Sequence, residues 1–292
     1  MIALTIKEQL DNGINNLLVI KQFQDSESFI SKVKKTDWFY ISSAYNKAKS
    51  INLIGFNKYD EIYIDSDVGF LNYLLLFIIK VFNPRLVINV FEEGMGTYFS
   101  ENYFYNNFKL YVFSLFGIGT NFGSCIFTTS IFLYDTDRYL INCKRKPNNV
   151  IKIFKSIEDI CKNNFNFLDE SCVDLSVVIE SYKPKLESCL IILGTWIEPR
   201  NSLDSLDNSI LKAIEEANYN SRSDFVIIKE HPNLNRRNNI PNFKSSVIFN
   251  SSTPAEFLIF YLLSFFKTIK VIHHESTVSF YVKSSQVKFF DY

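Results

Sequence analysis

Several features that would place a chain in a familiar class are missing from this sequence. Lysine plus arginine equals aspartate plus glutamate at 31 each, and this zero balance gives no electrostatic reason to expect a nucleic-acid partner. None of the five cysteines forms a Cys-x-x-Cys pair, which favours reduced thiols over a disulfide framework or a zinc site. A phosphate-binding P-loop and a Ser-His-Asp order are also absent.

Membrane and export signals are lacking as well. The N-terminus has neither the basic start nor the long apolar core of a signal peptide. The longest apolar stretches, Leu71–Ile79 and Phe257–Phe266, are shorter than the roughly 20 residues that span a bilayer. We therefore expect a cytoplasmic protein. The 29 phenylalanines and 16 tyrosines leave room for a peripheral contact at the inner face of the membrane.

What the sequence does contain is a globular composition with 47% hydrophobic residues, and a length of 292 residues that favours two domains. Short β-branched runs alternate with longer helical stretches, which predicts βαβ units and parallel sheets. The expected strands are 17–20, 61–64, 86–91, 150–154, 190–193, 225–228, 247–249 and 269–272, and the expected helices are 25–34, 68–81, 202–218 and 254–266. A proline-containing break near 180–187 predicts two Rossmann-like α/β domains, 1–183 and 184–292, that face each other across a cleft.

The first polar cluster follows the strand that ends at Phe91. Glu92 and Glu93 come directly after this buried strand, and Gly94 and Gly96 permit a tight turn there. Ligands of open α/β sheets bind at this end of the strands. Adjacent, partly buried carboxylates raise each other's pKa, so one of them could act as a general base. A surface turn with two solvated glutamates explains the pattern equally well.

The second cluster is Lys229-Glu230-His231-Pro232, again at the end of a predicted strand. A histidine there could donate to a phosphate or protonate a leaving group. A structural His-Pro turn is the competing interpretation.

The third cluster, His273-His274-Glu275-Ser276-Thr277, follows the last predicted strand. Ser276 and Thr277 could open a short helix and bind an anion, although an ordinary N-cap explains the pair on its own. Adjacent residues on a strand point to opposite faces, so the evidence that the two histidines bind a metal together is weak.

A fourth candidate, Glu256, lies just after Thr253 and Pro254, which we expect to be the N-cap and the first residue of a helix. Its carboxylate could accept hydrogen bonds from a ribose diol. A purely structural explanation is that its negative charge interacts favourably with the helix dipole in the first turn.

Taken in order, these clusters resemble the motifs of bacterial sialyltransferases of the lipooligosaccharide and capsular polysialyltransferase type. The shared pattern is an acidic pair before glycine, then His-Pro, then a Ser/Thr pair: here Glu92-Glu93-Gly94, His231-Pro232 and Ser276-Thr277. The resemblance extends from about Leu17 to Phe280. Threonine replaces the second serine of the last motif, the first strand is short, and the chain ends at Tyr292 soon after that motif.

The resemblance implies a GT-B fold that uses neither metal nor cofactor and holds a CMP-sugar donor in its C-terminal domain. It assigns the acceptor-side base to Glu92 or Glu93, and phosphate contacts to Ser276, Thr277 and the His231-Pro232 motif, with His231 assisting the departure of CMP. Glu256 matches the glutamate that binds the cytidine ribose. Lys229 and Thr195 would line the nucleotide pocket.

The function implied is inverting transfer of sialic acid, or a related nonulosonic acid, from a CMP-sugar to a glycan acceptor of a surface polysaccharide or lipooligosaccharide. Transfer of another CMP-sugar, such as Kdo or a legionaminic-type acid, would need the same nucleotide-binding motifs. A GT-B-like protein that binds nucleotide or glycan without turnover, and a flavodoxin-like pair of signalling domains, are the remaining alternatives.

Overall fold

The computed structural model describes most of the chain. For the strands 17–21 and 40–44 it describes the backbone alone. The remaining described residues are 59–101, 105–163, 170–182, 187–194, 203–220, 224–229, 243, 246–249, 253–274 and 276–292.

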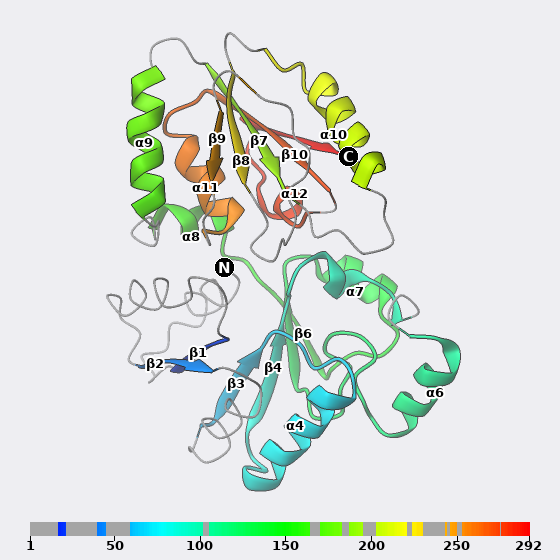
Figure 1. Cartoon of the computed structure of the whole chain (residues 1–292). Coiled ribbons are helices and arrows are strands. Elements are labelled where there is room, and N and C mark those ends of the chain that lie inside the picture. Colours follow the sequence, from blue (N-terminus) through cyan, green and yellow to red (C-terminus); the bar gives the residue numbers. More distant parts are fainter. Residues whose placement is uncertain are drawn as a thin grey trace. The chain divides into compact units, whose positions relative to one another are not determined.

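The chain divides into two compact units, each with its own parallel sheet (Figure 1). The first unit holds Met1–Gln22 and Asp37–Ser156, and the second holds Phe23–Thr36 and Ile157–Tyr292. This division after Ser156 falls earlier in the sequence than the predicted boundary at 183. The physical reason is that helix α8 (Ile157–Asn163) packs against helix α11 (Ala255–Leu262) of the C-terminal unit.

The sheet of the first unit has four parallel strands in the order β3-β4-β5-β6. A separate parallel pair, β1 (Leu17–Lys21) and β2 (Tyr40–Ala44), belongs to the same unit. The sheet strands are β3 (Glu61–Ile64), β4 (Val87–Phe91), β5 (Ser130–Leu133) and β6 (Asn149–Lys152). The helices are α4 (Phe70–Phe82), the 3₁₀ helix η1 (Met95–Tyr98), α6 (Asn107–Leu115) and α7 (Thr136–Asn142).

The core of this unit forms where α4 covers β3 and β4. Leu76 and Ile79 of the helix pack with Ile62 and Ile88 of the two strands, and all four side chains are less than a tenth exposed. Four of the five residues of β4 are apolar and its three central residues are buried, as in a parallel strand whose two faces are both covered. Burial of these side chains therefore fixes the end of β4, where Glu92 and Glu93 follow.

The second unit has five parallel strands in the order β11-β10-β7-β8-β9. The chain starts in the centre, runs outward through β8 and β9, and then crosses to the other side of β7. This is the strand order of Rossmann sheets, whose ligands bind at the switch point beyond the carboxyl ends of the central strands. The strands are β7 (Ser188–Leu193), β8 (Asp224–Lys229), β9 (Ser246–Phe249), β10 (Thr268–His273) and β11 (Val287–Asp291). Besides α8 and α11, the helices are α9 (Glu170–Tyr182), α10 (Leu203–Glu216) and α12 (Val278–Tyr281).

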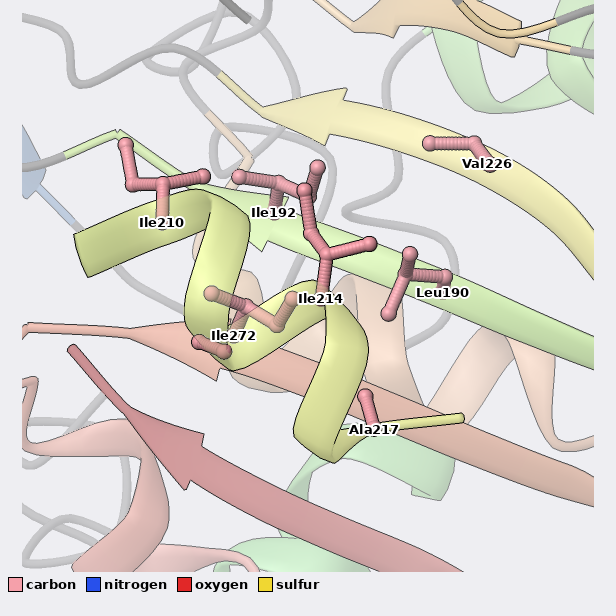
Figure 2. Packing of buried hydrophobic residues seen from close by; sticks show 8 residues of the cluster. Leu190, Ile192, Ile210, Ile214, Ala217, Val226 and Ile272 are labelled. Carbon is pink, nitrogen blue, oxygen red and sulfur yellow. The ribbon is translucent and has the colours of Figure 1, made fainter. Parts of the chain in front are cut away.

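Helix α10 covers one face of this sheet (Figure 2). Ile210 and Ile214 of the helix pack against Leu190 and Ile192 of β7 and Ile272 of β10. These side chains are at most 8% exposed, so each contributes about 1.5–3 kcal/mol through burial of its apolar surface. This packing holds β7 and β10 as neighbours, and thereby holds the switch point together.

A buried ion pair lies where β7, β8 and β10 are joined near their amino ends. Asp224 accepts hydrogen bonds from Ser188, from the Asn220 N–H at 2.9 Å and from the Lys270 amine at 2.9 Å. Burial alone would raise the pKa of Asp224, but these three donors outweigh it and lower the pKa.

We expect Asp224→Asn to lower the free energy of unfolding by about 1–3 kcal/mol near neutral pH, because it weakens charge-assisted hydrogen bonds of a buried group. A carboxylate with a lowered pKa stabilises the fold above its unfolded pKa, and this contribution is lost as the pH falls through its folded pKa. The difference between wild type and variant in urea unfolding should therefore shrink below about pH 4. Asp174→Asn, at an exposed position on α9, is the control. A difference that stays constant with pH would contradict this assignment.

Candidate functional site

Glu92 lies at the end of β4 in the first unit and is fully buried. Its carboxylate accepts a hydrogen bond from the Tyr98 hydroxyl of η1 and one from the Tyr134 N–H at 2.9 Å. Burial raises the pKa of Tyr98, and the charge of Glu92 raises it further, so the tyrosine stays protonated and donates. Glu92 therefore joins β4, η1 and the end of β5, and holds the following turn in place.

Glu93 has the opposite environment, since its side chain is exposed at the carboxyl edge of the sheet. Its N–H donates to Thr97 Oγ1 at 3.0 Å, which fixes the backbone of the turn. Gly94 adopts φ 137°, a conformation that favours glycine, and a Cβ placed at Gly96 would meet no atom within 4 Å. Of the two glutamates, Glu93 is thus the one whose side chain is exposed to solvent.

In the second unit, Lys229 and Glu256 are two buried groups of opposite charge. Lys229 ends β8, is 7% exposed, and has its amine 5.7 Å from the ring centroid of Phe249. Glu256 is 8% exposed in the first turn of α11. Burial raises the pKa of Glu256, and the positive charge of Lys229 opposes this shift. Burial is the larger effect, so the pKa of Glu256 is raised overall despite the charge of Lys229.

The start of α11 differs slightly from the sequence expectation. Pro254 occupies the N-cap position and the helix begins at Ala255, so Thr253 lies one residue too early to be the cap. Glu256 is in the first turn, as predicted.

The segment after β10 carries the Ser/Thr pair. Ser276 donates its N–H to His273 Nδ1 at 3.4 Å, and its hydroxyl accepts from the Val278 N–H at 3.3 Å. Thr277 precedes α12 and makes no side-chain capping bond. Burial lowers the pKa of His273, while Asp291 at 3.8 Å acts in the opposite direction. A neutral His273 that accepts from Ser276 therefore shapes this turn.

Two further residues at this edge, His274 and Tyr292, were not recognised from the sequence as part of one group. His274 Nδ1 donates to the main-chain oxygen of Tyr292, and the two rings stack at 5.4 Å. The Tyr292 hydroxyl donates to the Leu193 carbonyl at 3.3 Å, at the end of β7. No pattern in the sequence indicates this group, because it forms through the parallel pairing of β10 with β11, in which His273 lies opposite Asp291.

The structure thus brings Lys229, Ser276 and Thr277 to the carboxyl ends of the strands of the second sheet, and Glu256 is linked to Lys229 by their charges. Glu92, Glu93, Gly94 and Gly96 lie at the same kind of edge in the first unit. Thr195, His231 and Pro232 lie outside the described residues, and their roles stay predictions.

Metal-binding groups do not gather in the described part of the chain, where no three His, Cys, Asp or Glu side chains are placed to hold an ion. His273 and His274 instead bond Ser276 and Tyr292, as described above. The independence from metal implied by the resemblance stays a prediction.

Comparison with known proteins gave matches only among solved structures. No protein-family model matches the sequence, and no curated protein matches it. A 2,6-sialyltransferase of a Photobacterium species, solved with the donor product CMP and the acceptor substrate lactose, aligns with a TM-score of 0.55. The two chains are 13% identical, and the alignment covers 94% of this chain and 70% of the other.

Two further structures align less closely. One is the GT-B domain of a sialyltransferase from Photobacterium damselae, with a TM-score of 0.48, 12% identity and coverage of 94% and 90% of the two chains. The other is MnaA of S. aureus with UDP, with a TM-score of 0.46, 12% identity and coverage of 89% and 74%.

The chain has a GT-B type of fold. Its two α/β units, each built on a parallel sheet, and the alignment over 94% of the chain agree on this point. The fold predicted from the strand–helix pattern and from the motif resemblance is therefore confirmed.

Proposed function

We propose that this protein is an inverting glycosyltransferase that transfers sialic acid, or a related nonulosonic acid, from a CMP-sugar to a glycan. The observation that carries the proposal is where the acidic pair, Lys229 and the Ser/Thr pair lie. Glu93 is exposed at the carboxyl edge of one parallel sheet, while Lys229 and the Ser276-Thr277 pair lie at the carboxyl edge of a sheet with Rossmann strand order. The aligned sialyltransferase was solved with CMP and a glycan, which supports this choice of substrates.

In the proposed reaction, the acceptor hydroxyl loses its proton to the Glu93 carboxylate as its oxygen attacks the anomeric carbon of the donor. The bond between that carbon and the phosphate oxygen breaks, and CMP leaves with the electron pair. Attack from the face opposite the leaving group inverts the configuration. A base is needed because a neutral hydroxyl is a weak nucleophile.

The nucleotide is held by the second unit. Glu256 accepts hydrogen bonds from the ribose hydroxyls, and the hydroxyls of Ser276 and Thr277 donate to the phosphate. Lys229 supplies the nearby positive charge that a phosphate anion requires. His231 assists the departure of CMP, and Pro232 and Thr195 complete the pocket, as the motif resemblance implies.

The direct test incubates the full chain with CMP-sialic acid and follows the release of CMP without and with lactose and other glycans, in buffer containing a chelator. We expect glycan-dependent release that the chelator does not change. CMP binding without release from any glycan would favour a non-catalytic nucleotide-binding protein. The absence of both binding and release would refute the proposal, and loss of CMP affinity on chelation would refute metal independence.

A further inference from the structure

Helix α4 of the first unit exposes an unusually apolar outer face. Only Leu76 and Ile79 of its residues are buried. The outer side chains are between 39% and 69% exposed, and they are Phe70, Leu71, Leu74, Phe77 and Val81. A helix on the surface of a globular unit normally presents polar residues there. A continuous apolar patch of this kind marks an interaction site.

A second set of exposed apolar side chains lies on α6, a largely apolar helix that has no buried residue. Its exposed apolar side chains are Phe108, Tyr111 and Leu115, followed directly by Phe116, and they are between 64% and 76% exposed.

The segment around Ile126 connects the two helices. The ring of Phe127 lies 5.3 Å from Tyr73 and 6.2 Å from Phe77 of α4. The neighbouring Ile126 is 67% exposed and donates its N–H to the Gly117 carbonyl at 2.9 Å, just after α6. We call the exposed side chains of α4, α6, Phe116 and Ile126 the α4–α6 surface.

The charged residues of the segments that carry this surface are all basic. No aspartate or glutamate occurs in 68–91 or in 105–134, where the charged residues are Lys80, Arg85 and Lys109. Beside α6, Lys144 and Arg145 line a pocket of about 400 Å³ together with residues of that helix. Glu101 also lines this pocket, and its carboxylate accepts from the Arg145 N–H at 3.1 Å.

We propose that the α4–α6 surface docks the protein on an anionic lipid bilayer. The apolar side chains enter the boundary between headgroups and acyl chains, and the lysines and arginines at the border attract the negative lipids. A second copy of the chain is a poorer occupant, because it would bring the same basic border against this one. The inference stands on the surface alone and does not depend on the proposed function.

The helices are expected to lie along the membrane. Helix α4 has 13 residues, a length of about 20 Å at 1.5 Å per residue, against a hydrocarbon core of about 30 Å. Among the described residues, no helix combines the length and the apolar character needed to cross a bilayer.

The test is sedimentation of the full chain with vesicles of phosphatidylcholine, alone or mixed with phosphatidylglycerol. We expect binding to the mixed vesicles that weakens with added salt. Leu71→Ser combined with Phe108→Ser should weaken it by at least about tenfold, since two exposed apolar side chains no longer enter the membrane. Val177→Ser is the matched control, because Val177 is 63% exposed on α9 of the other unit. Its binding should match that of wild type.

The electrostatic part is tested separately with Lys109→Gln and Lys144→Gln, each expected to weaken binding about fivefold. Thermal unfolding, followed by circular dichroism in every variant, reports that both units are folded and should not change. Vesicle binding that survives the double serine substitution would overturn the proposal. So would a wild-type dimer in solution that this substitution converts to monomer, because the surface would then join two copies of the chain.

Discussion

Replacing Glu93 by glutamine is expected to lower the rate of glycosyl transfer by about 10²–10⁴-fold, the usual cost of removing a general base. Glutamine has nearly the same shape but cannot take the acceptor's proton. The affinity for CMP should stay within a few-fold of wild type, since the nucleotide contacts lie in the other unit. Transfer is measured with saturating donor and acceptor, and CMP affinity by calorimetry.

The matched control is Asp137→Asn, which removes one exposed carboxylate from the first turn of α7, just beyond β5 of the same sheet. Its activity should remain close to wild type. Near-normal turnover of Glu93→Gln would refute the role of Glu93. If Glu92→Gln instead abolished transfer in a protein with unchanged thermal stability, the base would be Glu92.

The second large effect is expected from the buried pair Lys229 and Glu256. Replacing both, as Lys229→Met with Glu256→Gln, should weaken CMP binding by about 100-fold or more, because charge-assisted hydrogen bonds to phosphate and ribose contribute about 1.5–3 kcal/mol each. The double variant removes both charges together and so leaves no unmatched buried charge. Its stability should therefore be closer to wild type than that of either single variant.

Comparing the single variants with the double variant separates an effect on CMP binding from an effect on stability. Calorimetry gives the CMP affinity, and thermal unfolding gives the stability of the two single variants and of the double variant. A stable double variant that binds CMP normally would show that the pair is only structural and that the nucleotide is held elsewhere.

Much of the fold could be predicted from the sequence pattern of each single strand. The apolar runs of β4, β7 and β8 are long enough to be recognised, and the structure places these strands within two residues of the predicted bounds. Strands β2, β5 and β11 were missed. Ser130–Leu133 contributes only three apolar residues, and Val287–Asp291 is interrupted by lysine and aspartate. Both are strands because neighbouring strands pair with them, which no local pattern records.

For the candidate site too, some features follow from the sequence and others from the tertiary structure. By itself, the sequence determined that polar clusters follow apolar strands, since a buried run must end where charged groups can reach water. It also determined the order of the motifs.

Only the tertiary structure decided which of the two glutamates is exposed to solvent. Tyr98 and Tyr134 donate hydrogen bonds to Glu92, and Tyr134 directly follows β5, 42 residues away in the chain. Tertiary structure also decided that β10 pairs with β7 and carries Ser276 and Thr277 to the switch point. Strand pairing depends on contacts between distant segments and on the helices that cover them, so it is not encoded in either strand alone.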